Sequence, residues 1–345
     1  MKFLHLKDDP SPYNKTSQEQ DNNAKMSSRT LLSSLLSLGA GSGLTYLLLK
    51  NSTTSSAAST GVSVAPASKR PVPAAASEAP VDPAGFFKYG FPGPVHDLER
   101  RESLVSCYDR EKRNPAWVVE HFTPESLATK GGNRKGSVFT EDEAIPELFR
   151  AKLADYFRSG YDRGHQVPAA DAKWSQRAMD DTFMLTNMCP QVGQGFNRDY
   201  WAHFEFFCRD LTKQYGSVRV MTGPLYLPHK DADGKTRVSY EVIGNPPNVA
   251  VPTHFFKLVV AEKPAKGGSS EMIAVEAFVL PNATIANDTP LTDFVVPLST
   301  VERHAGITLM QNADARNMLA LCKQVNCQIT VRDFSNKMKS VEGKK

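Results

Sequence analysis

The chain has 345 residues, with 41 Lys or Arg against 37 Asp or Glu, which gives a formal net charge of +4. This mild basicity is compatible with a polyanionic substrate, but it also fits the ordinary solvation of a protein surface, so by itself it excludes no class of function. The five cysteines include no CxxC pair and no paired Cys/His spacing, which argues against a structural zinc site and a dense disulfide framework; we expect mostly reduced thiols, with a Cys322–Cys327 bond open but not predicted.

Residues 1–50 form a predicted targeting region. Within it, 31–49 is an uncharged apolar run about as long as a membrane-spanning helix, which needs roughly 20 residues, although its serines and glycines weaken the span. Read from Met26, the sequence is Ser-rich, basic and free of acidic residues until well past Lys50, as in mitochondrial import segments. We therefore expect a mitochondrial protein of the intermembrane space or inner membrane, with 31–49 as an anchor or sorting signal. A secretory signal-anchor is the alternative, and a start at Met1 or Met26 stays open.

A linker and a single folded region follow. Residues 51–85 are rich in Ser, Ala, Pro and Val and cannot bury enough apolar area to fold, so we predict that they are disordered. The sequence after them is long enough for one sizeable core, which we place at 86–335. Residues 336–345 form a basic tail.

The folded region is predicted to contain runs of strands with few helices. The run at 253–260 is apolar nearly throughout and should be the central strand. Helices are predicted at 173–181 and 197–215, loops at 131–139 and 190–195, and a helix after 312 is left open. This order predicts an α+β fold with a largely antiparallel sheet packed by helices. The other predicted strands are 104–108, 116–122, 161–167, 183–187, 218–222, 240–243 and 272–279.

The tetrapeptide Asp162-Arg163-Gly164-His165 places a histidine where a strand meets a loop. Histidine has an ordinary pKa of about 6.5 and can accept a proton near neutral pH. Arg163 can neutralise a phosphate oxygen or hold an acid in place, and Gly164 can adopt unusual backbone angles. The combination suggests a general base beside an anionic substrate, although a lone histidine is more often structural than catalytic.

A longer pattern follows this tetrapeptide. The segment DDTFMLTNMCPQVGQGFNRDYWAHFEFFCR contains, in order, Asn187, Pro190-Gln191, Asn197, Trp201, Glu205 and Arg209. Together with supporting segments at 117–127, 221–228, 242–257, 278–283 and 294–307, it resembles the DNA/RNA non-specific endonucleases, a family of ββα-metal (His-Me finger) nucleases. The resemblance covers roughly 86–308.

The resemblance implies a ββα-metal nuclease fold, in which a largely antiparallel central sheet is flanked by helices. It implies a homodimeric enzyme that hydrolyses phosphodiester bonds of DNA and RNA with Mg²⁺, for which Mn²⁺ is the expected substitute, and that leaves 5′-phosphate and 3′-hydroxyl ends. It also implies storage in mitochondria, with release and relocation to the nucleus for DNA degradation during cell death (apoptosis).

Two residues have the clearest roles under this resemblance. His165 corresponds to the general base, which contributes typically 10²–10⁴-fold to the rate. Asn197 corresponds to the metal-holding residue, and one amide oxygen is enough because Mg²⁺ keeps several waters and takes phosphate oxygens as ligands. The alternative for Asn197 is that it only caps the helix that follows, because asparagine is a favoured N-cap.

Glu205 and Arg209 stand four residues apart on one helix face, where a plain surface pair would be worth a few tenths of a kcal/mol. Through the resemblance, Glu205 holds metal-bound water and Arg209 contacts phosphate. Asn187 corresponds to an active-site asparagine that hydrogen-bonds the reacting region.

The remaining predicted site residues are charged. Asp162 and Arg163 are expected to support the strand end and the imidazole of the base. Arg134, in the segment GGNRKGSVF, corresponds to a phosphate-binding arginine, although Lys135 competes for that role.

Other functions have weaker support. The sequence contains no GxSxG, HExxH or GxxxxGK[ST] motif. His254 and Trp201 are interpreted as core residues, and a nucleophilic role for Cys189 would need a nearby base. The main alternative is a catalytically silent nucleic-acid-binding scaffold on a nuclease fold. A second alternative is a metal-dependent phosphodiesterase for small substrates.

Overall fold

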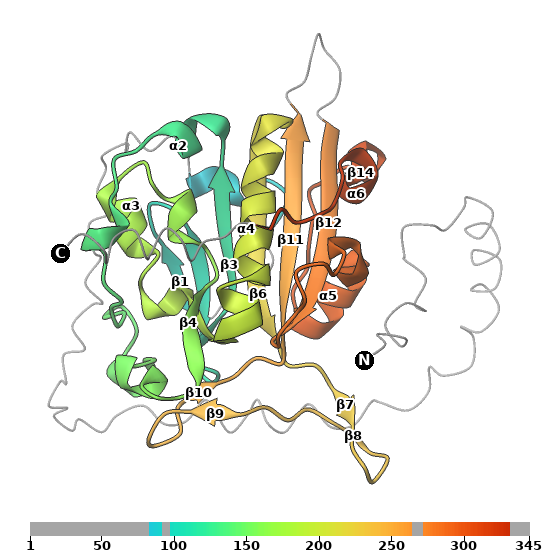
Figure 1. Ribbon diagram of the computed structural model, residues 1–345. Helices are drawn as coiled ribbons and strands as arrows, with labels where there is room; N and C mark the ends of the chain where they lie inside the picture. The colour runs from blue at the N-terminus through green and yellow to red at the C-terminus, as the bar shows by residue number, and fades with distance from the viewer. Residues whose placement is uncertain (1–82, 92–96, 264–271, 332–345) are drawn as a thin grey trace, which may run out of the picture. The chain divides into compact units, whose positions relative to one another are not determined.

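The computed structural model describes residues 83–91, 97–263 and 272–331. Its main feature is a sheet whose neighbouring strands run antiparallel, apart from one parallel pair, which confirms the predicted largely antiparallel sheet (Figure 1). Within the described part, eight strands form this sheet, in the order β1 (Asp97–Arg100), β2 (Val105–Asp109), β3 (Asn114–Phe122), β6 (Ser217–Leu225), β11 (His254–Lys263), β12 (Met272–Pro281) and β13 (Val295–Val296), with β14 (Met318–Ala320) parallel to β12.

Helices cover both faces of the sheet. On one face, Phe255 of β11 packs in the same core as α4 (Tyr200–Asp210), which lies in front of the sheet in Figure 1. On the other face, Phe256 packs in the same core as α5 (Leu298–Ala305). Side chains alternate between the faces of a strand, so a strand covered on both sides is apolar nearly throughout. The predicted central position of this strand is confirmed.

The helix ends follow ordinary capping rules. α2 (Pro124–Ala128) begins at Thr123, whose side chain accepts a hydrogen bond from the backbone of the third helical residue. α3 (Gln176–Asp181) is capped in the same way by Ser175, and α5 has Gly306, at φ 66°, as its C-cap. Short 3-10 turns connect the longer elements: η2 (Pro83–Phe87), η3 (Arg134–Gly136), η4 (Glu147–Phe149), η5 (Leu153–Tyr156), η6 (Ala169–Asp171), η7 (Leu185–Asn187), η9 (Leu211–Lys213), η10 (Leu291–Phe294) and η11 (Ala315–Asn317).

Beside the main sheet, β4 (Tyr161–His165) and β5 (Met188–Val192) form a separate antiparallel pair. A π-helical turn, η8 (Gly193–Asn197), then leads into α4. The paired strands β4 and β5 and the helix α4 therefore occur in the ββα order that the resemblance implied, with α3 in the connection between the two strands. Two further short pairs lie outside the main sheet: β7 (His229–Lys230) with β8 (Thr236–Arg237), and β9 (Val242–Ile243) with β10 (Val249–Ala250).

Three predictions near these short pairs were wrong. The strand predicted at 183–187 contains the turn η7, and the loop predicted at 190–195 begins inside β5. Proline usually interrupts a central strand, but Pro190 is tolerated because β5 pairs only with β4 in the described part of the chain. The strand predicted at 240–243 is β9, which joins β10 instead of the main sheet.

The helix predicted at 197–215 is shorter than expected. Its N-cap is Asp199, its α-helical part ends at Asp210, and η9 continues the chain. Gly195, at φ 79°, turns the backbone just before Asn197, which ends η8 and does not cap the helix. The capping alternative for Asn197 was therefore wrong. Trp201 is fully buried, as expected for a core residue.

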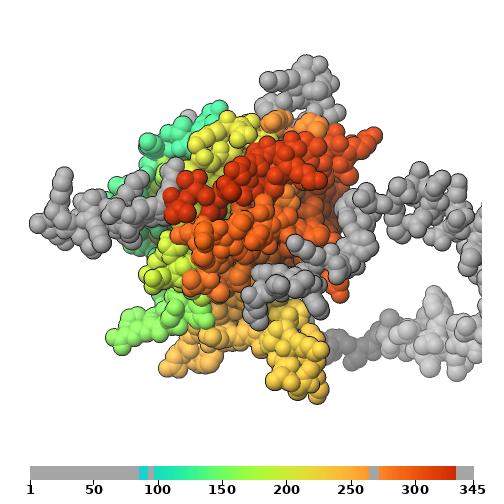
Figure 2. All heavy atoms as spheres, turned by 45° about the vertical axis from the view of Figure 1, so that its right-hand side comes forward, coloured from blue at the N-terminus to red at the C-terminus, as the bar shows by residue number. Residues whose placement is uncertain are grey.

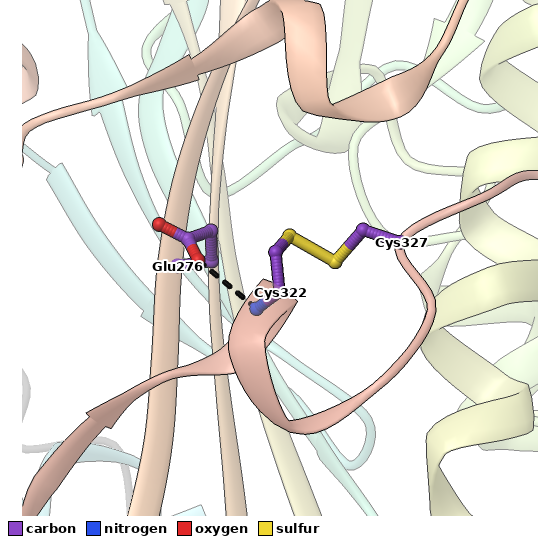
Figure 3. The surroundings of a disulfide bond; sticks show 3 residues. All are labelled: Glu276, Cys322 and Cys327. Atoms are coloured by element: carbon purple, nitrogen blue, oxygen red, sulfur yellow. Dashed lines mark hydrogen bonds between the residues drawn. A yellow bond between two sulfur atoms is a disulfide. The ribbon is translucent and has the colours of Figure 1, made fainter.

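The C-terminal part contains a disulfide that we did not predict, between Cys322 and Cys327 (Figure 3). The expectation of reduced thiols fails here because α6 (Leu321–Gln324) and the turn after it bring the two Cα atoms to 5.2 Å, within disulfide range. The open question of a helix after 312 resolves into η11, β14 and this short α6. The other cysteines are buried and reduced, as expected: Cys107, Cys189 and Cys208.

The segment after the disulfide lies across α4, as Figure 1 and the red strip in Figure 2 show. Val325 and Ile329 pack against the core that contains Phe207 and Leu211 of the helix region. The far side of α4 from the main sheet is thus partly covered by the C-terminal segment.

Three predicted regions fall beyond the described residues. These are the apolar run 31–49, nearly all of the linker 51–85, and the tail 336–345. Within 83–91, 97–263 and 272–331, no helix has the length and apolar character needed to cross a membrane.

Candidate active site

One cavity collects nearly all of the predicted site residues. Its volume is about 980 Å³, within the usual range of roughly 300–1,000 Å³ for ligand sites. His165 ends β4, Asn197 ends η8, and α4 contributes the acid–base pair. Every predicted residue except Asn187 lines this cavity: Arg134, Asp162, Arg163, His165, Asn197, Glu205 and Arg209.

His165 is held as a neutral base. Its ring packs edge-on against Phe183 with centroids 4.9 Å apart, and it is tilted against Phe139 at 5.6 Å. Burial, and after it the positive charge of Arg134, lowers the pKa of His165 to about 3. Nε2 is buried and has no hydrogen-bond partner among the described residues, which leaves Nδ1 as the nitrogen that a molecule in the cavity can reach. A neutral imidazole with an open nitrogen can accept a proton.

The glycine before this histidine is required by close packing. A Cβ on Gly164 would lie 2.0 Å from Oε1 of Gln191, which is fully buried. Any side chain at this position would displace Gln191 or shift the strand that carries His165. This contact explains the glycine of the tetrapeptide without invoking unusual backbone angles.

Asn187 does not reach the cavity. Its side chain is 1% exposed, and its Oδ1 accepts a hydrogen bond from the backbone nitrogen of Val167 at 3.0 Å. Nδ2 donates to the carbonyl oxygens of Val167 at 2.9 Å and Thr182 at 2.7 Å. The Asn187 carbonyl accepts from the backbone nitrogen of Gln166 at 2.9 Å. Asn187 therefore fixes the two residues that follow His165 and acts on the base through the backbone.

The amide of Asn197 has a fixed orientation. Its Nδ2 donates to Oδ2 of Asp162 at 2.9 Å, so Oδ1 lies at the opposite end of the amide group. Arg198 Nε donates to the same carboxylate oxygen at 2.7 Å. Burial opposes ionisation of Asp162, but the hydrogen bonds from Arg198 and Asn197 outweigh it and lower the pKa. The structure thus places the support from Asp162 at Asn197 and not at the imidazole.

Glu205 and Arg209 form another wall of the cavity. Arg209 Nη1 donates to Oδ1 of Asp171 at 2.7 Å, and the side chain of Asp171 is 3% exposed. A guanidinium has five N–H donors, so this pair leaves donors for a phosphate oxygen. Burial raises the pKa of Glu205 to about 7, opposed by the charges of Lys257 and Arg209. Glu205 therefore exchanges a proton near neutral pH when no cation is bound.

More buried charges lie on the sheet beneath α4. Lys257 is 1% exposed, its Nζ donates to Oγ1 of Thr222 at 2.8 Å, and it lies 4.4 Å from the centroid of a Trp201 ring. Glu120 is 4% exposed, and burial, followed by the negative charge of Asp171, raises its pKa. These groups set the electrostatic field behind the cavity wall.

Two arginines frame the imidazole through aromatic rings. The guanidinium carbon of Arg134 lies 5.7 Å from the centroid of Phe183, and that of Arg163 lies 4.3 Å from the centroid of Phe139. These are the same two rings that flank the base. Lys135, the competitor for the phosphate-binding role, is not among the residues that line the cavity.

Sequence reasoning missed residues that support this site. Arg198 directly follows Asn197, and its place in the motif was an available signal. Asp171 gave no signal, because it lies 38 residues from Arg209 and only the fold brings the two side chains together. Lys173 and Arg158 add further positive charge to the cavity lining.

The donor set fits a hydrated cation. Within the ranges that the structure describes, no three His, Cys, Asp or Glu side chains are grouped to hold a metal ion. The cavity instead offers the oriented amide oxygen of Asn197 and the carboxylate of Glu205. Mg²⁺ prefers oxygen ligands and keeps several waters, so these groups suit a Mg²⁺ ion held largely by water and phosphate.

The chain is similar to known nucleases. The family model described as DNA/RNA non-specific endonuclease matches residues 82–316. The chain is 63% identical over 313 residues to the mitochondrial nuclease of Saccharomyces cerevisiae, covering 90% of this chain and 94% of that protein. It is 46% identical over 229 residues to the mitochondrial endonuclease G of Homo sapiens, covering 66% and 74% respectively. EndoG in the crystal structure of an EndoG/EndoGI complex aligns with a TM-score of 0.65 and 46% identity, over 70% of this chain and 97% of that one.

Proposed function

The chain belongs to the DNA/RNA non-specific endonuclease family, and on this premise we propose that it is a Mg²⁺-dependent endonuclease that hydrolyses phosphodiester bonds of both DNA and RNA. The predicted ββα-metal nuclease fold is confirmed by the structural match. The observation that carries the proposal is one cavity in which a neutral histidine, an oriented amide, a carboxylate and several guanidinium groups meet. Mn²⁺ is the expected substitute for Mg²⁺.

His165 is the general base of the proposed reaction. Because it is neutral at physiological pH, it accepts a proton from the attacking water. A phosphate beside it favours the imidazolium form and so raises its proton affinity during the reaction. The new P–O bond forms as the bond to the 3′-oxygen breaks, which leaves 5′-phosphate and 3′-hydroxyl ends.

The arginines of the cavity hold the phosphate. Arg134, Arg163 and Arg209 present guanidinium groups, which match phosphate oxygens in charge and geometry. Phosphate contacts carry affinity but no sequence information, so these side chains favour cleavage with little selectivity for sequence or sugar.

Asn197 would hold the cation through Oδ1, and Glu205 would hold the waters around it. When bound, Mg²⁺ supplies a positive charge that stabilises the leaving 3′-oxygen. Asp162 accepts a hydrogen bond from Nδ2 of Asn197, which would leave Oδ1 for the ion.

We also propose a mitochondrial location and a homodimer. The yeast and human relatives are named as mitochondrial proteins, and residues 26–50 resemble an import segment. We propose further that residues 31–49 anchor the protein at the inner membrane or in the intermembrane space. During cell death the protein would be released and would move to the nucleus. A fluorescent fusion of residues 1–85 should reach mitochondria, and its appearance in the endoplasmic reticulum would contradict the import hypothesis.

Digestion of plasmid DNA and RNA by the full chain tests the nuclease activity. We expect cleavage of both with Mg²⁺, none with EDTA, and none by a folded His165→Ala variant. Binding without cleavage in any divalent metal would favour the silent scaffold. Cleavage of a small diester but not of plasmid would favour the small-substrate phosphodiesterase.

A further inference from the structure

A firmly held turn presents an aromatic ring at the wall of the active-site cavity. Phe157 follows η5, is 73% exposed, and lines the same cavity as His165. The segment that carries it projects at the lower left of Figure 2, in green. A single exposed apolar side chain needs no special reason. At this position, however, the backbone is in an unusual conformation and the surrounding charges are positive.

The turn uses left-handed backbone at two of three consecutive residues. Arg158 has φ 55° and Gly160 has φ 86°. The left-handed region is unfavourable for a residue with a Cβ, so the surroundings must enforce it at Arg158. Ser159 donates to the carbonyl oxygen of Tyr156 from its backbone nitrogen at 3.3 Å and from Oγ at 3.0 Å. These bonds close the turn that contains Phe157.

The residues before the ring anchor the turn to the protein. Asp155 is buried, and its Oδ2 accepts from the backbone nitrogen of Lys152 and from Nδ2 of Asn248, both at 2.7 Å. Tyr156 is 5% exposed and packs in one core with Met188 of β5. The backbone that carries the ring is therefore held in place before any ligand arrives, which reduces the entropic cost of binding.

The charges around the ring suit a polyanion. The guanidinium carbon of Arg158 lies 5.1 Å from the centroid of the Phe157 ring and covers part of it. Arg163 and Lys173 line the same cavity. Aromatic side chains within a positively charged groove are the means by which proteins bind single-stranded nucleic acid, because bases stack on the rings while cations contact the backbone.

We propose that Phe157 is a stacking platform for a nucleobase of the strand whose phosphate occupies the cavity, so that the protein binds its substrate as a locally unstacked single strand. This inference rests on the proposed function and adds a base contact to a site otherwise made of phosphate contacts. Every base has a π face, so such a platform increases affinity without selecting a sequence.

Binding by the full chain in EDTA tests the inference, because no metal-dependent cleavage then interferes. Fluorescence anisotropy gives the Kd of an oligothymidine strand, an oligouridine strand and an abasic strand of equal length. The wild type should bind each base-bearing strand roughly tenfold more tightly than the abasic strand. Phe157→Ala should remove this difference, whereas Phe157→Trp, which keeps a ring, should preserve it.

Leu148→Ala is the matched control, since Leu148 is 76% exposed and does not line the cavity. It should show wild-type Kd values, and melting temperatures should confirm that all variants are folded. If Phe157→Ala keeps the full difference between base-bearing and abasic strands, the inference is wrong even when Mg²⁺-dependent cleavage proves the proposed function. If no strand binds in EDTA, the inference is wrong, and the digestion assay with Mg²⁺ decides on the proposed function separately.

Two alternative partners of the Phe157 ring, a membrane and a second copy of the chain, would give different experimental results. Phe157→Ala could abolish association with anionic phospholipid vesicles, or it could dissociate a dimer in sedimentation velocity, without changing the difference between strands. Either result would assign the ring to a membrane or to a second copy of the chain and overturn the stacking platform.

Discussion

The partly buried imidazole of His165 links the site to the acid stability of the fold. Its pKa is about 3 in the folded chain and about 6.5 in the unfolded chain. Below pH 6.5 the unfolded chain binds a proton that the folded chain does not, so the free energy of unfolding falls as the pH falls towards 3. At 1.36 kcal/mol per pKa unit, discounted for partial exposure of the ring, the loss between pH 7 and pH 5 should be roughly 1–2 kcal/mol.

His165→Gln should lack this loss, because glutamine does not titrate. Urea unfolding of both proteins at pH 7 and pH 5 measures the effect. The difference in the free energy of unfolding between wild type and variant should be smaller by roughly 1–2 kcal/mol at pH 5 than at pH 7. An identical pH dependence of the two proteins would show that His165 is not held neutral.

The carboxylate of Asp162 is the support for Asn197. Asp162→Ala frees the amide to rotate and leaves Arg198 without its partner, so we expect the Mg²⁺ concentration for half-maximal cleavage to rise roughly tenfold. Initial rates of plasmid nicking across a Mg²⁺ series provide the measurement. Asp180→Ala removes an exposed carboxylate outside the cavity lining and should leave the Mg²⁺ dependence unchanged. A slower Asp162→Ala enzyme with wild-type Mg²⁺ dependence would contradict this role.

Among the secondary-structure elements, the pattern of apolar residues predicted those that pack against a large core. β11 and α4 have continuous or one-sided apolar patterns because each packs on a large core, and their positions followed from sequence. β5 was missed because Pro190 suggests a loop, and only its pairing with β4 shows that it is a strand. The turn around Phe157 was also missed, since the left-handed backbone at Arg158 has no signature in residue type.

The candidate site divides in the same way. His165 and Asn197 stand in a recognisable motif, so their positions and proposed roles came from sequence. Asp171 and Lys257 came only from the fold, because each depends on a partner that is distant in sequence. Asn187 was recognised, but its buried hydrogen bonds to backbone are a tertiary property.

The C-terminal disulfide is expected to stabilise the segment that covers α4. Cys322 and Cys327 close a short loop, for which the loss of unfolded-state entropy predicts about 2 kcal/mol of stabilisation. Cys327→Ser should lower the melting temperature by several degrees, since roughly 2–4 °C per kcal/mol is expected for a domain of this size. Differential scanning calorimetry provides the measurement. Cys208→Ser, which removes a buried reduced thiol, shows whether loss of any sulfur has the same effect.

Reduction with dithiothreitol distinguishes the effect of the disulfide bond from the effect of the serine substitution. It should lower the melting temperature of the wild type to that of Cys327→Ser and leave the variant unchanged. Equal melting temperatures of oxidised and reduced wild type would mean that the segment stays on α4 without the bond.

For the molecule as a whole, the distribution of charge matters more than its sum. A formal charge of +4 over 345 residues is modest. The cavity, however, is lined by six cationic side chains and two acidic ones: Arg134, Arg158, Arg163, Lys173, Arg198 and Arg209, with Asp162 and Glu205. Nucleic-acid binding should therefore depend on this local excess of positive charge and not on the net charge of the protein.

Salt dependence tests this concentration of charge. Each phosphate contact releases counterions, so the slope of log Kd against log salt reports the number of contacts, at about 0.7 per contact for single strands and 0.9 for duplex DNA. Arg163→Gln removes one cavity cation and should reduce the slope by about 1. Arg316→Gln removes a cation that is 88% exposed, paired with Asp314 and outside the cavity lining, so it should leave the slope unchanged. Anisotropy titrations in EDTA over a range of NaCl concentrations give both slopes. An equal reduction of the slope in the two variants would mean that the strand contacts the whole protein surface and is not held mainly by the cavity.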